Sequence, residues 1–328
     1  MVLVTGGTGF LGAYIIQDLV EKGYKVRALR REGSKLPFFV PASIFSTVEW
    51  VESDVLDVVG LDAAMEGVDT VIHAAAVVSF SPDMKKAMRQ VNIEGTANVV
   101  NVALEKGVRR FVHISSVAAL GRTRSGETVT EKKEWTETSL NSVYAITKYK
   151  AEMEVWRGIA EGLEGLILNP SIVLGYGDWN NSSNAIFKAV YNQFPWYTTG
   201  VNGFVYVKDV ARTTVLLMES TITGERFIIN GDNWSYEKVF NTIADAFGKR
   251  RPHRKVTPFL ALVALITEKV KYLVTGKKSL LTRETARASQ SETYYVNEKI
   301  TTALPGFQFT PLETVIRESA EQYLRHIG

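Results

Sequence analysis

The stretch VTGGTGFLG at residues 4–12 constrains the fold of this chain more than any other part of its sequence. Its glycines at positions 6, 9 and 12 follow the apolar run Val2–Val4 and come before the helix-like run 13–23. This order predicts a strand, a tight turn and a helix. Glycine accepts positive φ angles and has no Cβ atom, and the first N–H groups of a helix lack intrahelical partners. Such a turn can therefore bind an anion.

A second strand after this helix completes the β-α-β frame that a dinucleotide site needs. The run KVRALRR is that strand, and it ends on Arg30 and Arg31. An ordinary glycine-rich turn is the alternative interpretation of the glycines taken alone. The presence of the whole frame favours a dinucleotide site.

Composition excludes several other classes of protein. The chain has 328 residues, of which 45% are hydrophobic, enough for one large or two modest domains. Its net charge of +3 offers no general field for nucleic acid, and we expect the basic cluster 248–255 to be a solvated loop. Cysteine is absent and the four histidines show no metal-ligand spacing, so we expect no disulfide and no metal site.

Two features bear on where the protein acts. No signal-peptide pattern precedes the first predicted strand, so we expect a cytoplasmic protein. The apolar stretch 256–274 is interrupted by Glu268, Lys269 and Lys271, short of the ~20 residues that span a bilayer. Its helical spacing predicts an amphipathic helix that packs on the protein or covers an apolar substrate, with membrane-surface binding as the alternative.

Short apolar strands alternate with helices up to about residue 175, which predicts an α/β fold with a doubly wound parallel sheet. We expect a dinucleotide-binding domain at 1–175 and a smaller, mostly helical substrate-binding region at 176–328. A segment near 203–230 is expected to return to the sheet. The six predicted strands of the first domain lie within 2–6, 24–30, 46–55, 68–76, 109–120 and 165–175.

The second chemical signal is YAITK, which places Tyr144 and Lys148 one helical turn apart on the same face. A tyrosine with a pKa near ~10 is a poor acid or base at neutral pH, but a neighbouring ammonium lowers that pKa. Ser115 and Ser116 precede the pair in HISS. Together with the glycine turn, this set indicates proton transfer beside a bound dinucleotide.

These stretches resemble the extended short-chain dehydrogenase/reductase family, also called the NAD-dependent epimerase/dehydratase superfamily, along the whole chain. The likeness is greatest to its dihydroflavonol-4-reductase-like and 3β-hydroxysteroid-dehydrogenase-like branch. It implies a Rossmann-type domain, a C-terminal substrate domain and a bound nicotinamide cofactor. Further matching stretches are DVLD at 54–57, HAAA at 73–76, VNIEGT at 91–96, NPSIVLG at 169–175 and FVYVKDVA at 204–211.

The resemblance implies a role for each catalytic candidate. Tyr144 would exchange a proton with the substrate oxygen, and Lys148 would hold the nicotinamide ribose and lower the pKa of the tyrosine. Ser116 would hydrogen-bond the substrate oxygen, with Ser115 as the alternative. Asn92 would support a proton relay, with a structural bond to a bent helix as the alternative.

The resemblance also implies a set of cofactor-binding residues. The pair 54–55 would meet the adenine ring, although an acidic residue at a strand end can equally cap the next helix. The small residues 74–76 would let the backbone pass close to the cofactor, although a buried strand end has the same pattern. The full set is Gly6, Gly9, Phe10, Leu11, Gly12, Arg30, Arg31, Asp54, Val55, Ala74, Ala75, Ala76, Lys148, Pro170 and Ser171.

The end of the second strand also predicts the choice of cofactor. NAD-using relatives carry an acidic residue there, and this chain has Arg30, followed by Arg31. Guanidinium groups pair well with phosphate, so we expect NADP(H) rather than NAD(H). Two solvated arginines are the alternative.

Two stretches bear on the substrate. SSVAALG has Leu120 where epimerases and dehydratases of the family usually carry a tyrosine. The aromatic residues of 187–197 suit a flat apolar substrate or form a packed core. We therefore expect a homodimeric oxidoreductase that reduces a ketone or aldehyde, or oxidises a secondary alcohol, of mainly apolar character. The alternatives are a nucleotide-sugar epimerase or dehydratase and a non-catalytic nucleotide-binding protein.

Overall fold

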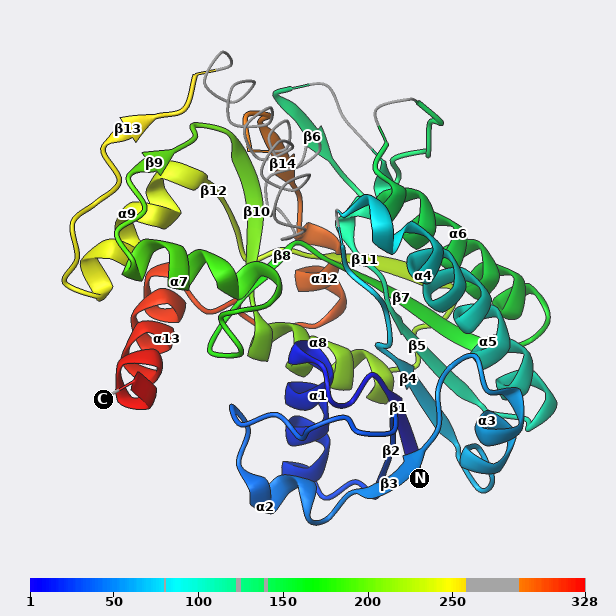
Figure 1. Ribbon diagram of the computed structural model, residues 1–328. Helices are drawn as coiled ribbons and strands as arrows, with labels where there is room; N and C mark the ends of the chain where they lie inside the picture. Colours follow the sequence, from blue (N-terminus) through cyan, green and yellow to red (C-terminus); the bar gives the residue numbers. More distant parts are fainter. Residues whose placement is uncertain (80, 122–124, 139–140, 258–288, 328) are drawn as a thin grey trace.

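The computed structural model describes residues 1–79, 81–121, 125–138, 141–257 and 289–327. Its centre is a seven-stranded sheet with the strand order β11-β7-β5-β4-β1-β2-β3 (Figure 1). Every neighbouring pair in this sheet is parallel, which confirms the predicted α/β fold. The strands are β1 (Val2–Thr5), β2 (Val26–Arg30), β3 (Glu49–Glu52), β4 (Thr70–His73), β5 (Arg110–Ile114), β7 (Glu164–Pro170) and β11 (Glu225–Ile229).

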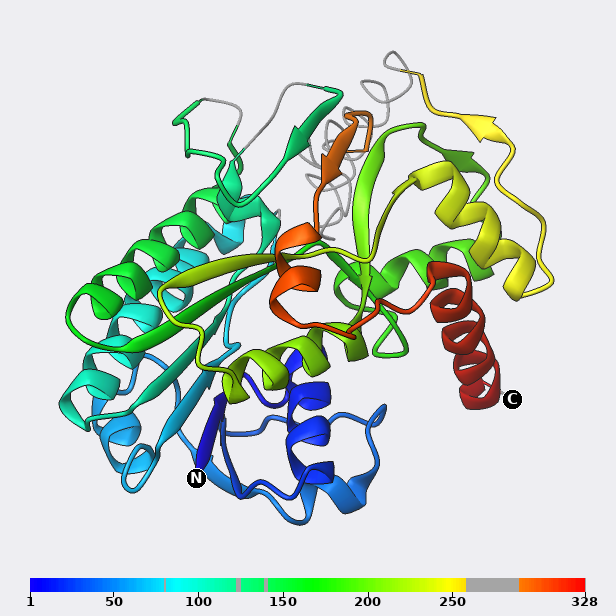
Figure 2. The same ribbon diagram turned by 180° about the vertical axis from the view of Figure 1, so that it is seen from behind.

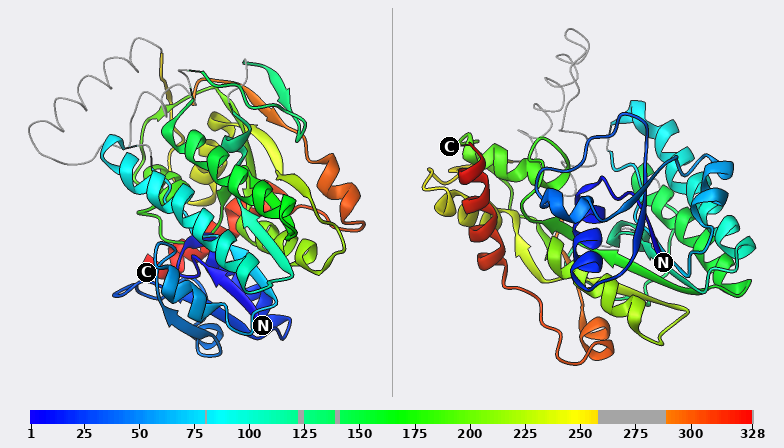
Figure 3. Two further views of the ribbon diagram at one scale, coloured as in Figure 1. Left: turned by 90° about the vertical axis from the view of Figure 1, so that its right-hand side faces the viewer. Right: turned by 90° about the horizontal axis from the view of Figure 1, so that it is seen from below.

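Helices cover both faces of the sheet (Figures 1 and 3). Side chains alternate along each strand, so Val4 of β1 enters a core with α1 and α8 while Leu3 enters a second core with α3, α5 and α6. This double burial explains why the inner strand β1 (VLVT) is almost continuously apolar, whereas no residue of the edge strand β3 (EWVE) is buried. The helices of the two layers are α1 (Phe10–Glu21), α2 (Ala42–Phe45), α3 (Val58–Ala64), α4 (Lys85–Arg89), α5 (Gly95–Glu105), α6 (Val143–Ala160) and α8 (Val207–Glu219).

The run 165–175, predicted as one strand, divides at Ser171 into β7 and β8 (Ile172–Leu174). β8 leaves the main sheet and pairs with β10 (Val201–Tyr206), which also pairs with β12 (Asp232–Ser235). The chain then returns to the main sheet at β11. The division into two domains near residue 175 stays a prediction.

The part of the chain after β8 combines helices with short strands, where mostly helices were predicted after residue 232. The helices α7, α9 and α13 pack against one another, and α12 lies against β11 (Figure 2). The strand pairs β9–β13 and β6–β14 tie distant segments together. The bounds are β6 (Glu127–Val129), α7 (Ala185–Tyr191), β9 (Trp196–Tyr197), α9 (Tyr236–Ala246), β13 (Arg254–Lys255), β14 (Thr293–Tyr295), α12 (Glu298–Ala303) and α13 (Leu312–Ile327).

Two predictions about surface segments meet different outcomes. Most of the basic cluster 248–255 is exposed after α9, and within it Arg251 pairs with Asp245 at 2.7 Å. The amphipathic helix predicted at 256–274 lies outside the described residues from position 258 onward. Within the part of the chain that the structure describes, no helix could cross a membrane.

Candidate active site

The glycine turn joins β1 to α1 at the carboxyl edge of the main sheet. Gly6 has a φ of +73°, and a Cβ atom there would lie 2.7 Å from the backbone nitrogen of Ala75. A Cβ atom on Gly12 would lie 2.2 Å from the carbonyl oxygen of Gly6. Gly9 is the N-cap of α1 and donates its N–H to Gly6 at 2.9 Å. The turn therefore folds tightly onto itself and onto the end of β4.

This turn fits the diphosphate of a dinucleotide. The N–H groups of Phe10, Leu11 and Gly12 belong to the first turn of α1 and have no intrahelical acceptor. They carry the positive end of the helix dipole, and the glycines leave space for a ligand to reach them. The neighbouring segment Ala74–Ala76 is only partly buried, and Ala75 donates its N–H to the Thr5 hydroxyl at 3.2 Å.

The sequence places Tyr144 and Lys148 on α6, and the fold brings both to the end of β5. The Tyr144 phenol shares a hydrogen bond with the Ser116 hydroxyl. Lys148 is 3% exposed, and its Nζ donates to the carbonyl oxygen of Ile114 at 2.9 Å. Ser142 is the N-cap of α6 and accepts from the N–H of Ala145, which sets where the helix begins.

The pKa values of this pair differ from the sequence expectation. Burial raises the pKa of Tyr144, and the hydrogen bond with Ser116 opposes that rise. Burial lowers the pKa of Lys148 to about 8, while the charge of Glu152 acts in the opposite direction. The expectation that Lys148 lowers the tyrosine pKa was therefore wrong in the net direction, because desolvation of the phenolate dominates.

The two neighbouring serines point to different partners. The Ser116 hydroxyl faces Tyr144 and accepts from the N–H of Ala118 at 3.2 Å. The Ser115 hydroxyl instead donates to the buried carboxylate of Glu152 at 2.5 Å. Successive side chains of an extended segment point to opposite sides, so only one of the two can face Tyr144.

Asn92 lies in a π-helical turn, Gln90–Glu94, between α4 and α5. Its amide bonds to both backbone groups of Val77, with Val77 N to Oδ1 at 2.7 Å and Nδ2 to Val77 O at 3.0 Å. Nδ2 also donates to the hydroxyl of Thr147 at 3.1 Å. The residue thus joins α6 to the segment after β4, rather than bonding the backbone of its own helix.

The candidate adenosine contacts lie at the ends of β2 and β3. Arg30 is partly exposed and Arg31 is exposed, and neither side chain has a hydrogen bond or ion pair within the described residues. Asp54 accepts from the N–H of Leu56 at 3.0 Å, whereas the N-cap of α3 is Asp57. The alternative that Asp54 caps the next helix was therefore wrong.

The aromatic residues of 187–197 do not form one wall. Phe187 is fully buried and packs against Phe247 and Tyr323, at centroid distances of 6.4 and 5.3 Å. Tyr191 packs against Phe247 at 5.3 Å. Both fill the space where α7, α9 and α13 meet, so for these two the packed core is the correct alternative.

Pro170 ends β7, and the buried Ser171 donates its N–H to Ile229 of β11 at 3.1 Å. The residue before them, Asn169, is fully buried and contacts both Glu152 and the backbone of Ser116. Sequence reasoning missed Asn169 and Glu152. The signal for Glu152 was its position, one helical turn after Lys148 on the face of α6 that carries Tyr144.

Comparison with known proteins decides the family. Residues 2–230 match the NAD dependent epimerase/dehydratase family. The chain belongs to this family. Cinnamoyl-CoA reductase 1 of Oryza sativa subsp. japonica is 32% identical, over 70% of this chain and 71% of its own length. Sterol demethylase protein B of Methylococcus capsulatus is 31% identical, over 79% of this chain and 78% of its own length. The crystal structure of gox2253 has a TM-score of 0.83 at 29% identity and covers 99% of this chain and 98% of its own.

The predicted family is therefore confirmed. As a member of the NAD dependent epimerase/dehydratase family, the chain is an NAD(P)-dependent oxidoreductase of the extended short-chain type that acts on a small molecule. The described residues contain no group of three or more potential metal ligands. A family enzyme of this kind needs a nicotinamide cofactor, and the glycine turn described above provides space and donors for its diphosphate.

Gly12→Ala tests the tightness of this turn. We expect the free energy of unfolding to fall by about 1–3 kcal/mol, because the new Cβ atom would overlap a backbone oxygen that cannot easily move. Denaturant unfolding measures this change. Gly9→Ala is the matched control, since its Cβ atom would lie 3.1 Å from the same oxygen and should cost less. A Gly12→Ala protein as stable as Gly9→Ala would contradict the packing described here.

Proposed function

We propose that this enzyme reduces a ketone or aldehyde of mainly apolar character, with Tyr144 as the proton donor. The observation that carries the proposal is the hydrogen bond between Tyr144 and Ser116, next to the buried Lys148 and at the same edge of the sheet as the glycine turn. A nicotinamide bound at this edge of the sheet would supply the hydride.

Burial keeps the Tyr144 phenol protonated at neutral pH, which is the state that can donate a proton to a carbonyl oxygen. Ser116 shares a hydrogen bond with the phenol and would bind the same substrate oxygen. Lys148 is held by the Ile114 carbonyl group and would bind the ribose hydroxyls of the cofactor. Asn92 would keep α6 at a fixed distance from the segment after β4 through its bonds to Thr147 and Val77.

The names of two relatives support a substrate with an apolar part, and one of them also supports reduction. One is named a cinnamoyl-CoA reductase and the other a sterol demethylase protein, and the cinnamoyl group and the sterol are both mainly apolar. Leu120 is fully buried at the place where a sugar-modifying relative would carry a tyrosine. The proposal therefore favours aromatic or polycyclic carbonyl compounds over nucleotide sugars.

The test is NADPH oxidation, followed by absorbance, with cinnamaldehyde, a dihydroflavonol and a 3-ketosteroid as probes. We expect turnover of at least one of them. UDP-glucose is the control substrate, and its conversion without net change in NADPH would contradict the proposal and support an epimerase. Tightly bound NAD in the purified protein would support the same alternative, because a redox-neutral enzyme retains its cofactor.

The cofactor is proposed to be NADP(H), bound through Arg30 and Arg31. Each guanidinium–phosphate bond is typically worth ~1.5–3 kcal/mol, so replacing both arginines by alanine should cost one or more decades of NADPH preference. Fluorescence titration of NADPH and NADH measures the ratio. Arg109→Ala is the control, because Arg109 lies at the opposite end of the sheet, where β5 begins. Tighter binding of NADH than NADPH by the unmodified protein would refute the proposal.

A homodimer and a cytoplasmic location are part of the same proposal. Light scattering on the purified protein tests the first. Fractionation of producing cells tests the second.

A further inference from the structure

A buried carboxylate lies behind the proposed catalytic residues. Glu152 of α6 is 0% exposed, and its Oε1 accepts from the Ser115 hydroxyl and from Nδ2 of Asn169, both at 2.5 Å. Its Oε2 lies 3.6 Å from a guanidinium nitrogen of Arg226. The carboxylate thus contacts the end of β5, the end of β7 and the strand β11 from a position on α6.

One of these contacts leads directly to Ser116. The Asn169 amide nitrogen donates to Glu152 and also to the backbone carbonyl oxygen of Ser116, at 2.9 Å. The Glu152 carboxylate therefore holds Asn169 in the orientation that fixes the Ser116 backbone. Ser115, the neighbour of Ser116, is held by the same oxygen. Two hydrogen bonds to one carboxylate oxygen thus determine where the segment after β5 lies.

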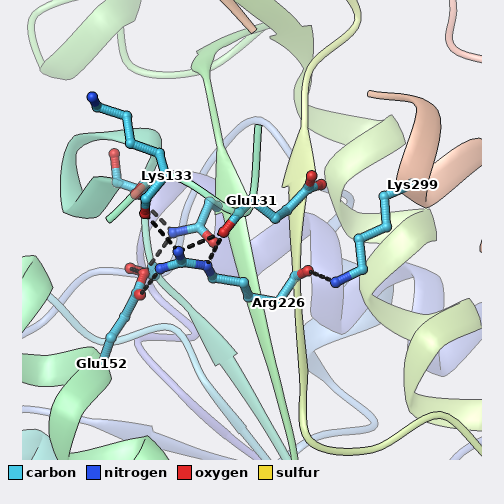
Figure 4. Close-up of polar contacts among 8 residues, drawn as sticks. Glu131, Lys133, Glu152, Arg226 and Lys299 are labelled. Atoms are coloured by element: carbon cyan, nitrogen blue, oxygen red, sulfur yellow. Dashed lines mark hydrogen bonds and ion pairs between the residues drawn. The ribbon is translucent and has the colours of Figure 1, made fainter. Parts of the chain in front are cut away.

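Arg226 connects this carboxylate to the segment that precedes α6 (Figure 4). Its guanidinium group donates to the carbonyl oxygens of Glu131 and Lys133, at 2.5–2.9 Å. The Glu131 side chain returns to β11 by accepting from the N–H of Ile228 at 2.9 Å. Lys299 of α12 binds the Arg226 carbonyl oxygen at 2.8 Å. Arg226 thus joins β11 to α6, to the segment that precedes α6 and, through its backbone carbonyl group, to α12.

A buried charge is expensive, and such a group is weak evidence for stability by itself. Burial raises the pKa of Glu152, while its contacts with Ser115, Asn169, Arg226 and Lys148 oppose the rise. An apolar side chain at this position would avoid the desolvation cost. A buried carboxylate here is therefore better explained by what its hydrogen bonds and its charge do for neighbouring residues.

We propose that Glu152 is a positioning residue for the active site, which holds Ser116 through Asn169 and places a negative charge one helical turn from Lys148. This inference rests on the proposed function, because it acts through the residues named there. It has two separable parts. The hydrogen bonds of Oε1 set the position of Ser116, and the negative charge acts on Lys148 one turn earlier on α6.

The charges around Lys148 come from three elements. His73 of β4 and His113 of β5 face it, and burial keeps the pKa of both imidazoles low, so they are neutral at pH 7. On α6 itself, Glu152 raises the pKa of Lys148, and Tyr144 is protonated at this pH. Among these groups, Glu152 is the one whose charge favours the ammonium form.

Two substitutions separate the two parts. Glu152→Gln keeps the size of the side chain and an acceptor oxygen for Ser115 and Asn169, but it removes the charge. Glu152→Asp keeps the charge, but its shorter chain withdraws the oxygen from both donors. Glu154→Gln is the matched control on the same helix, because Glu154 is partly exposed and pairs with Arg157 at the surface.

The charge is tested on the cofactor-free protein by NMR titration of ¹³C-labelled lysine, with the Lys148→Met spectrum to assign the Lys148 signal. We expect the titration midpoint of the Lys148 ammonium group to fall by about 1 pH unit in Glu152→Gln, because the nearby negative charge is lost. The midpoint should stay unchanged in Glu152→Asp and Glu154→Gln. A purely structural role would not move this midpoint. An unchanged midpoint in Glu152→Gln would overturn this part.

The position of Ser116 is tested by NADPH oxidation with the best carbonyl probe of the panel. We expect kcat to fall about tenfold in Glu152→Asp with a smaller change in KM, since a displaced hydrogen-bond donor weakens the transition state. A kcat equal to that of the wild type in Glu152→Asp would overturn the proposed positioning of Ser116. If Glu152→Gln fails to fold, Glu152→Asp still gives an independent result. The lysine titration needs no substrate, so it can succeed even if the wild-type protein reduces none of the probes. In that case a lower Lys148 midpoint in Glu152→Gln would support the role of the charge, and only the proposed function would be refuted.

Discussion

Tyr144→Phe is expected to lower carbonyl turnover by a factor of ~10² to 10⁴, the usual contribution of a positioned acid or base. The substitution removes only the phenol oxygen, and α6 retains its N-cap at Ser142. NADPH affinity should therefore stay unchanged while kcat falls. Stopped-flow absorbance for the reaction and fluorescence for cofactor binding give the two values separately.

Lys148→Met is the companion variant, and we expect it to lower both turnover and NADPH affinity. Its effect should not multiply with that of Tyr144→Phe, because residues that act as a unit are not additive. Tyr149→Phe is the matched control, because Tyr149 directly follows Lys148 on α6 and its ring stacks on that of Trp135 at a centroid distance of 4.3 Å. Turnover of NADPH at the wild-type rate by Tyr144→Phe would show that the assignment is wrong.

Acid should destabilise the protein through two buried histidines behind this site. His73 and His113 stack at a centroid distance of 5.2 Å, and burial lowers the pKa of His73 to about 3 and that of His113 well below its usual value. Within the part of the chain that the structure describes, neither ring nitrogen of His113 has a hydrogen-bond partner. The unfolded chain binds a proton at each histidine below about pH 6.5, whereas the native state does not.

The free energy of unfolding should therefore fall as the pH drops below about 6.5, by up to ~1.4 kcal/mol per pH unit for each histidine. His113→Phe removes one of these titrations and should flatten the curve between about pH 6.5 and 4.5. Urea unfolding across this range measures the slopes. His253→Gln, at an exposed position, is the control. Equal slopes for His113→Phe and the wild type would contradict the prediction.

The sequence predicted the features that depend on neighbours along the chain. The strand, turn and helix at residues 2–21 follow from glycine placement and apolar periodicity, and both are local properties. The same holds for the alternation of strands and helices that led to the parallel sheet. The helix that carries Tyr144 and Lys148 was predictable for the same reason, because residues four apart on a helix share a face.

Contacts between distant segments were not predictable in this way. β8 leaves the main sheet after Ser171 because it pairs with β10, about thirty residues later in the chain. The choice between Ser115 and Ser116 as the partner of Tyr144 depends on which side of the extended segment faces α6. Neither outcome leaves a local pattern in the sequence.

The sequence by itself therefore determined the family, the alternation of strands and helices along the chain and the residue types available for chemistry. Only the tertiary structure decided the electrostatic state of those residues. Burial raises the pKa of Tyr144 and lowers that of Lys148, and the fold places the Glu152 carboxylate in contact with Ser115, Asn169 and Arg226 from three separate segments. The physical reason is desolvation: the free energy of a charge depends on all the groups packed around it, and these come from every part of the chain.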